Sequence, residues 1–171
     1  MSLVWLDQQL FLFLNHLPHP PLFDFLALAL SGAGTAGFIW FIIGVVIFAR
    51  EEKKDHWFFL PLVLAFLVGW LAVEEIFKPF FGRLRPLGAN TDGFSFPSGH
   101  ATIAWALAKI LAGEEKRSRW WFYGLAFLIA FSRIYLGQHY PFDVVAGAIF
   151  GWGIGASSLW LTRLIRKSLR S

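Results

Sequence analysis

The sequence contains no cysteine, and it has few charged residues for its length. The absence of cysteine excludes disulfides, thiolate chemistry and cysteine-ligated zinc. Charged residues make up 15% of the 171 residues, whereas a soluble domain has about 25%. Hydrophobic residues make up 57%, and 9 Trp and 20 Phe supply rings suited to membrane interfaces. The composition predicts an integral membrane protein, and the length predicts a single domain over residues 1–171.

Five apolar stretches are candidates to cross a bilayer, which requires roughly 17–25 residues per helix. They cover residues 35–49, 56–77, 101–112, 120–136 and 144–164. Residues 3–17 carry apolar side chains at helical spacing between polar ones, which is typical of an amphipathic helix lying on the membrane or against the bundle. The predicted fold is therefore all-α, a polytopic transmembrane helical bundle with this N-terminal helix. It has five spans, or six if residues 3–30 enter the bilayer.

Two patterns orient and pack these spans. Glycines at 147, 151 and 155 predict close packing of the last span against a neighbouring helix. Ten of the 15 Lys and Arg lie in three segments that share one side of a five-span protein: Arg50, Lys53, Lys54; Lys116, Arg117, Arg119; and Arg163, Arg166, Lys167, Arg170. Basic connections of this kind face the cytoplasm. The pattern predicts a protein of the inner (plasma) membrane with its opposite end outside the cytoplasm, and it explains the net charge of +4 without nucleic acid.

Three polar clusters lie on the predicted outer side, and polar residues at the membrane edge indicate a functional site. They contain, in chain order, Lys78, Arg85, Ser98, Gly99, His100, Arg133, His139 and Asp143. Arginines bind phosphate oxygens through paired N–H groups, and a lysine adds a point charge. A serine hydroxyl and the N–H groups of a helix start, made accessible by glycine, complete an anion site. These clusters therefore predict a phosphate site.

The two histidines of the clusters need separate roles. His139 and Asp143 are four residues apart, so the carboxylate is able to hold one ring nitrogen and leave the other free to attack. His100 is then the group that protonates the leaving alkoxide. A bound metal is not expected, because three nearby cations oppose it electrostatically.

The clusters resemble the signature of the type-2 phosphatidic acid phosphatase superfamily. That signature is Lys, six residues, Arg-Pro; then Pro-Ser-Gly-His; then Ser-Arg, five residues, His, three residues, Asp. Every position is matched between Lys78 and Asp143. The resemblance implies a metal-independent lipid phosphatase without a cofactor, whose small bacterial members act on undecaprenyl diphosphate, phosphatidylglycerol phosphate, phosphatidic acid or lipid A phosphate. It further implies a phosphohistidine at His139, orientation by Asp143, acid catalysis by His100, and phosphate binding by Lys78, Arg85, Ser98, Gly99 and Arg133.

Some alternatives stay open at this point. If the histidines do not serve phosphate hydrolysis, two other functions fit the clusters. One is a non-catalytic lipid-phosphate binder or transporter, and the other is a vanadate-dependent haloperoxidase. Arg83 lies between signature positions and either contacts a headgroup or faces water. Glu74 precedes Lys78 by four residues and is able to pair with it along a helix. The lipid headgroup and the oligomeric state are not readable from the sequence.

Overall fold

The computed structural model describes residues 2–50, 55, 57–89 and 92–169. Within these ranges the regular elements are helices, with one isolated bridge between Leu84 and Phe94. The predicted all-α class is therefore confirmed. Some residues named above lie outside the described ranges: Lys53, Lys54, His56 and Arg170.

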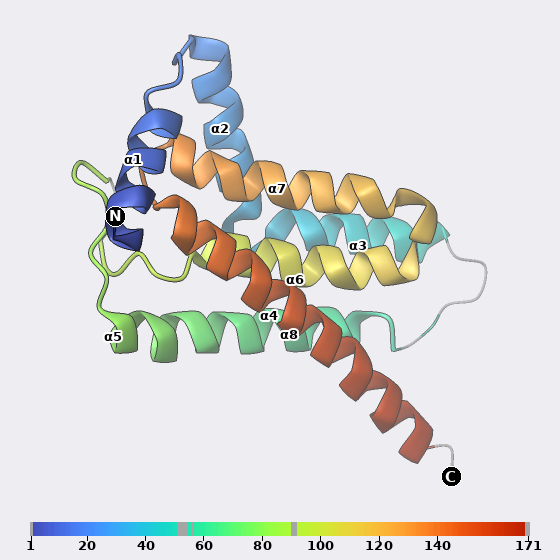
Figure 1. Ribbon diagram of the computed structural model, residues 1–171. Helices are drawn as coiled ribbons and strands as arrows, with labels where there is room; N and C mark the ends of the chain where they lie inside the picture. Colours follow the sequence, from blue (N-terminus) through green and yellow to red (C-terminus); the bar gives the residue numbers. More distant parts are fainter. Residues whose placement is uncertain (1, 51–54, 56, 90–91, 170–171) are drawn as a thin grey trace.

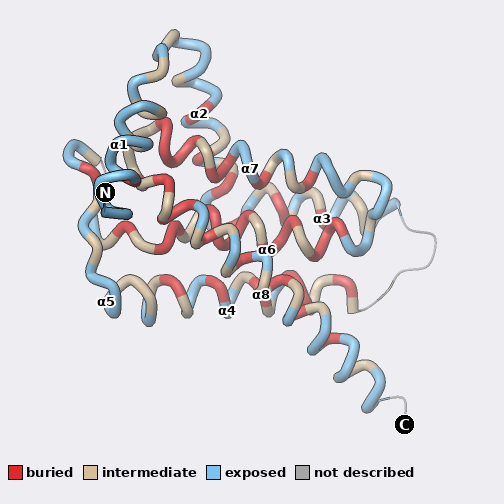
Figure 2. Tube along the Cα trace, in the orientation of Figure 1, coloured by how far each residue is buried: buried red, intermediate tan, exposed pale blue. Residues whose placement is uncertain are grey.

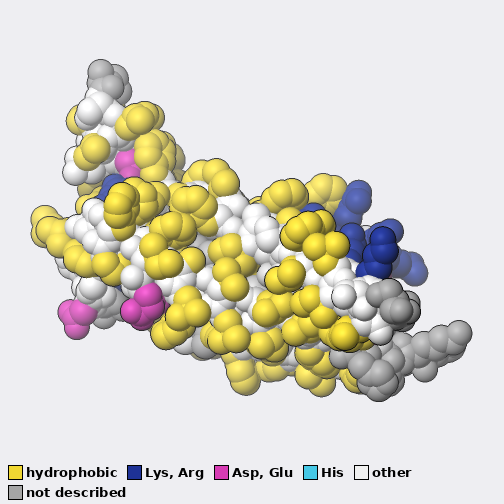
Figure 3. Space-filling model, turned by 90° about the horizontal axis from the view of Figure 1, so that it is seen from below, with side chains coloured by type: hydrophobic (Ala, Val, Ile, Leu, Met, Phe, Trp, Pro, Cys, Tyr) yellow, Lys and Arg dark blue, Asp and Glu magenta, His cyan; other side chains and the backbone are white. Residues whose placement is uncertain are grey.

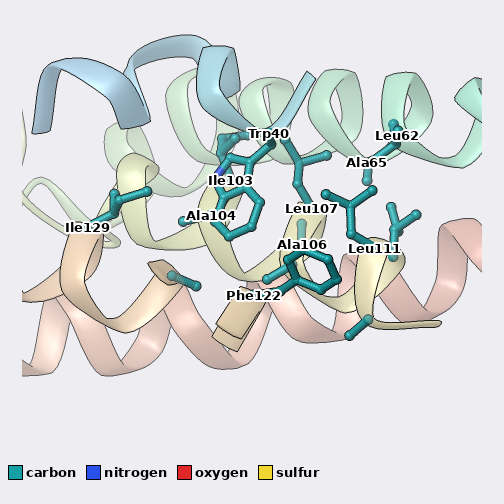
Figure 4. Packing of buried hydrophobic residues seen from close by; sticks show 14 of the residues in the cluster. Trp40, Leu62, Ala65, Ile103, Ala104, Ala106, Leu107, Leu111, Phe122 and Ile129 are labelled. Atoms are coloured by element: carbon teal, nitrogen blue, oxygen red, sulfur yellow. The ribbon is translucent and has the colours of Figure 1, made fainter. Parts of the chain in front are cut away.

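The bundle is built around α6 (Gly99–Glu114), which lies between its neighbours (Figure 1). Around it run α3 (Phe38–Arg50), α4 (Phe59–Leu71), α7 (Arg119–Tyr135) and α8 (Pro141–Ser168). Figure 4 shows their apolar side chains meeting on α6, among them Trp40, Leu62, Leu107, Phe122 and Ile129. Leu107 of α6 is fully buried, as are Trp40 of α3 and Leu62 of α4. Most residues of this helix are thus buried by the helices around it.

The predicted close packing of the last span is confirmed by the contact between α8 and α6. A Cβ built on Gly147, Gly151 or Gly155 would lie 2.1–2.6 Å from a backbone carbonyl oxygen of the helix or N-cap opposite it. Only glycine permits such an approach. Because Gly147 faces the carbonyl of Ser98, this packing fixes the start of α6 against the first turns of α8.

The outer surface of the helices is apolar. Exposed residues run along the outside of the bundle (Figure 2), and hydrophobic side chains cover most of the face shown in Figure 3. Among the described residues, two helices are long and apolar enough to cross a membrane, Phe59–Phe81 and Pro141–Ser168. If the bent pair Pro21–Gly34 and Phe38–Arg50 is counted as one span, the number rises to three. By this test the predicted count of five to six spans is not reached, because α6 and α7 have only 16 and 17 residues.

One end of the bundle is covered by α1 (Leu3–Asn15), from which the chain continues into α2 (Pro21–Gly34) (Figure 1). The helix α1 packs against the bundle through a face that carries Asp7 together with Phe11 and Leu14. Asp7 is 1% exposed, whereas Leu3 and Phe13 are 73% and 69% exposed. The predicted helix therefore exists, and its one fully buried residue is an acid, Asp7.

Candidate functional site

The fold brings the three predicted clusters to the end of the bundle that α1 covers. Lys78 begins α5 (Lys78–Phe81), His100 lies in the first turn of α6, and Arg133 lies in the last turn of α7. His139 occupies the turn between α7 and α8. The basic side chains visible in Figure 3 gather mostly at the opposite end of the molecule. The site and the basic connections therefore lie at opposite ends, as the sequence predicts.

The imidazole of His139 is held in one tautomer by its two neighbours. Its Nδ1 lies 2.8 Å from the backbone oxygen of Ser95, and its Nε2 lies 3.2 Å from Nη1 of Arg85. A carbonyl oxygen only accepts a hydrogen bond, so Nδ1 carries the hydrogen. A guanidinium only donates, so Nε2 carries the lone pair. The nitrogen that carries the lone pair is thus the one that faces Arg85.

The His139 ring is 2% exposed, and its surroundings keep it neutral. Burial is the largest influence and lowers the pKa of His139 to about 4, because the charged form loses hydration. The charges of Arg85 and Arg133 act in the same direction, whereas Asp143 opposes them. At neutral pH the ring therefore retains its lone pair, which a nucleophile requires.

Arg133 is fixed by hydrogen bonds to two side chains that the signature does not include. Its Nη1 donates to the hydroxyl of Ser31 in α2, and its Nη2 donates to Oε1 of Gln138. Its Nε is buried and has no hydrogen-bond partner among the described residues. A buried donor without a partner is costly, so this N–H suits an incoming phosphate oxygen.

Lys78 follows a π-helical turn, Ala72–Phe77, that carries its partner Glu74. The Lys78 Nζ lies 2.6 and 2.7 Å from the two carboxylate oxygens of Glu74, so the predicted pairing is confirmed. A cavity of about 270 Å³ opens between Glu74, His100 and Thr35, with Trp70 on its apolar wall. The His100 Nε2 lies 3.4 Å from the Thr35 hydroxyl. Arg133 and Lys78 lie close enough to His100 for their positive charges to act on its ring.

Ser98 and Gly99 form the start of α6 beside these groups. The Ser98 hydroxyl is buried and accepts a hydrogen bond from Ala101 N at 3.5 Å, which makes it the N-cap. The Ser98 N–H donates to the backbone oxygen of Asp143 at 3.0 Å. A Cβ on Gly99 would lie 3.2 Å from Oε1 of Glu74. The start of α6 is thus in direct contact with the start of α8 through Asp143, and it lies against Glu74.

Asp143 lies beside the ring of His139, in a different geometry from the one expected. Its Oδ2 is 3.6 Å from Nδ1 of His139, too long for a hydrogen bond, and the Ser95 carbonyl takes that bond. Oδ2 accepts instead from Tyr140 N at 2.9 Å, and Oδ1 accepts from Arg83 at 2.7 Å. The carboxylate therefore faces the ring as a charge and holds the first turn of α8.

Sequence reasoning missed four groups of this site: the Ser95 carbonyl, Ser31, Gln138 and Asp7. A backbone carbonyl leaves no sequence signal, and Ser31 lies 102 residues from its partner Arg133. Sequence reasoning also did not foresee that Arg83 bonds to the carboxylates of Asp7 and Asp143.

Among the described residues, no group of three or more His, Asp or Glu side chains is placed to hold a metal ion.

Comparisons with known proteins found matches over most of the chain. A family model described as the PAP2 superfamily matches residues 71–167. A Lipid A 4'-phosphatase from Bacteroides thetaiotaomicron is 32% identical, with 96% of this chain and 78% of that protein covered. An undecaprenyl-diphosphatase from Sulfolobus acidocaldarius is 32% identical over 63% of this chain and 54% of its own length.

Two solved structures share the fold. The crystal structure of Aquifex aeolicus LpxE has a TM-score of 0.74 and 32% identity, and the alignment covers 90% of this chain and 94% of that one. A transmembrane PAP2-type phosphatidylglycerolphosphate phosphatase from Bacillus subtilis has a TM-score of 0.74 at 23% identity, with 96% and 86% covered. The arrangement of the helices is therefore that of PAP2 membrane phosphatases. From its matched residues and its relatives, the chain belongs to the PAP2 superfamily.

Proposed function

We propose that this PAP2 membrane phosphatase hydrolyses a lipid phosphate monoester or diphosphate through a phosphohistidine on His139, without a metal ion. One observation carries the proposal. The lone pair of His139 Nε2 faces Arg85, and the nearby Arg133 keeps a buried Nε donor without a partner among the described residues. A neutral ring whose lone pair points to a cation, beside a buried donor that lacks an acceptor, is suited to attack on a bound phosphate dianion once Arg85 donates to a phosphate oxygen instead of to Nε2.

The reaction proceeds in two displacements at phosphorus. In the first, the Nε2 lone pair forms the N–P bond, the P–O bond to the lipid breaks, and His100 gives its proton to the leaving oxygen. The dianionic substrate favours the protonated form of His100, because an opposite charge stabilises the charged state. In the second, water attacks phosphorus, His100 takes a proton from that water, and the N–P bond breaks to return the lone pair to Nε2. Phosphate is released and both histidines regain their starting states.

The cations supply most of the catalysis in this scheme. Phosphoryl transfer needs mainly positioning and stabilisation of charge on the phosphoryl oxygens. Arg85 and Arg133 provide N–H donors, Lys78 provides a point charge, and Ser98 and Gly99 provide the start of α6. The Ser31 and Gln138 contacts hold Arg133 in place before substrate arrives, which reduces the reorganisation needed in the transition state.

The cavity beside His100 is where we place the leaving group. It combines the polar Glu74 and Thr35 with the apolar Phe66 and Trp70, which suits the junction between a headgroup and a lipid tail. The substrates to compare are lipid A phosphate, undecaprenyl diphosphate, phosphatidylglycerol phosphate and phosphatidic acid. Lipid A phosphate stands first, because the Bacteroides thetaiotaomicron relative named for it matches most of both chains. The ratios of kcat/KM across purified substrates decide the order.

The membrane arrangement that we propose has five spans, formed by the α2–α3 pair, Phe59–Phe81, α6, α7 and α8. Although α6 has only 16 residues, it is enclosed by other helices and need not match the lipid thickness. The basic end faces the cytoplasm and the site opens outside the inner membrane.

Cysteine labelling tests this topology, because the chain has no cysteine of its own. We expect Leu87→Cys, at a fully exposed position near the site, to react with an impermeant maleimide in intact spheroplasts. Arg117→Cys, in the α6–α7 connection, should react only after lysis. The reverse pattern would overturn the orientation.

Phosphate release by the wild type and His139→Ala tests the reaction itself. We expect the wild type to release phosphate from a lipid substrate and to form an acid-labile, base-stable phosphoenzyme, and His139→Ala to do neither. Equal release by both would end the histidine hypothesis. Binding without turnover by the wild type would favour the binder or transporter, and halide oxidation on adding vanadate would favour the haloperoxidase.

A further inference from the structure

Arg83 lies between two buried carboxylates that come from distant parts of the chain. Its Nη2 is 2.6 Å from Oδ2 of Asp7, and its Nη1 is 2.7 Å from Oδ1 of Asp143. Asp7 is 1% exposed and Asp143 is fully buried. Two carboxylates withdrawn from water this far would repel each other, so the guanidinium between them is required for both.

The same two carboxylates also hold the turn that follows His139. Oδ1 of Asp7 accepts a hydrogen bond from Phe142 N at 2.9 Å, and Oδ2 of Asp143 accepts from Tyr140 N at 2.9 Å. These N–H groups begin α8 and have no partner within the helix. The Arg83 guanidinium further stacks on the Tyr140 ring, with Cζ 4.2 Å from the centroid. A side chain of α1 thus fixes the backbone immediately after the nucleophile.

The charges of this cluster bear on the chemical step. When Nε2 of His139 forms a bond to phosphorus, the ring keeps its Nδ1 hydrogen and becomes cationic. The nearest carboxylate oxygen is Oδ2 of Asp143, 3.6 Å from Nδ1. Asp7, Arg83 and Asp143 together carry a net charge of −1, because two carboxylates flank one guanidinium. Without the charge of Asp7 the cluster is neutral. Arg83 then offsets the negative charge of Asp143, which is the charge that stabilises the cationic ring.

We infer that Asp7, acting through Arg83, is a positioning residue for the histidine step, and that α1 is therefore part of the catalytic apparatus. The inference rests on the proposed function, since it assigns a role in phosphorylation of His139. Asp7 lies outside the three clusters. A helix that only lay on the membrane surface would not need a buried acid, so the burial of Asp7 points to a role inside the protein.

The decisive variant is Asp7→Asn. An asparagine keeps the size of the side chain and an oxygen able to accept from Phe142 N, but it removes the charge. We expect kcat to fall about 10- to 100-fold, the range seen when groups that orient a catalytic ligand are removed, while KM changes less than about threefold. Asp7→Glu restores the charge and should recover part of kcat. The matched control is Asp24→Asn, which also removes a carboxylate bonded across the N-terminal region, to His19 and Tyr135, away from Asp143.

A double-mutant cycle separates positioning from simple stabilisation of the fold. If Asp7 acts through Asp143, Asp7→Asn should have little further effect on kcat in an Asp143→Asn background. Additive losses, or a wild-type kcat in the folded Asp7→Asn protein, would overturn the inference. The proposed function is judged separately by His139→Ala. If wild type and His139→Ala are equally active, the function fails; if only His139→Ala is inactive while Asp7→Asn retains full kcat, the positioning role alone fails.

Discussion

Replacing Gly151 by alanine tests how closely catalysis depends on the contact between α8 and α6. The added Cβ would lie 2.1 Å from the backbone oxygen of Thr102 and 2.9 Å from its carbonyl carbon. Neither atom is able to rotate away, so the helices must separate. Close-packed interiors do not absorb such an overlap. If the two helices moved apart by about 0.9 Å, the distance from the added Cβ to the Thr102 oxygen would still be only about 3.0 Å.

This displacement has two expected consequences. Overpacking of this kind costs about 1–3 kcal/mol of the free energy of unfolding. The start of α6 carries His100 and the start of α8 carries Asp143, so the same movement also separates groups to which we assign catalytic roles. A misplacement of about 1 Å lowers a rate by about 10²-fold. We therefore expect Gly151→Ala to lower both the unfolding temperature in detergent and kcat.

The matched control is Gly153→Ala, two residues along the same helix. A Cβ there meets no atom within 4 Å, and alanine favours a helix over glycine by about 1 kcal/mol. This variant should be at least as stable as the wild type and fully active. If Gly151→Ala resembled Gly153→Ala in stability and kcat, the stated role of the glycine contact would be wrong.

Three further predictions concern the site. In ¹⁵N-histidine NMR spectra, the resonances of His139 are those that disappear in His139→Ala. They should not titrate between pH 7.5 and 5.5, because burial lowers the pKa of His139 to about 4 and the ring stays neutral above that pH. A midpoint near 6.5, the ordinary value for histidine, would contradict the burial of the ring. Arg133→Ala should reduce kcat/KM by about 10²–10³-fold, the cost of losing a charge-stabilising donor, and retained activity would argue against its role. Prolonged chelation with EDTA should leave phosphate release unchanged; a loss that divalent metal restores would show that the reaction needs a metal.

Sequence patterns were sufficient for the class of fold and for the pairing of Lys78 with Glu74. Helical periodicity and apolar runs are local properties, and an interval of four residues brings two side chains together on any helix. The glycine stripe likewise predicts a close helix contact, although it does not name α6 as the partner. The span count was less readable, because a helix inside a bundle does not need the length of one that faces lipid.

The surroundings of the nucleophile were not accessible in this way. Ser95 contributes a backbone oxygen, and Asp7 reads in the sequence as the polar side of an amphipathic helix. Such a residue is expected to face water, yet it is buried against Arg83. The ring nitrogen of His139 was assigned a partner four residues away, and the closer partner is 44 residues away.

The sequence alone determined the membrane class, the helical bundle and the set of candidate phosphate-site residues, because composition, periodicity and motif spacing are fixed by the order of residues. Tertiary structure alone decided which nitrogen of His139 carries the lone pair, what holds Arg133, and that α1 turns its acid inward. These features depend on contacts between residues up to 135 positions apart. No local pattern specifies such contacts, since they follow from how whole helices pack.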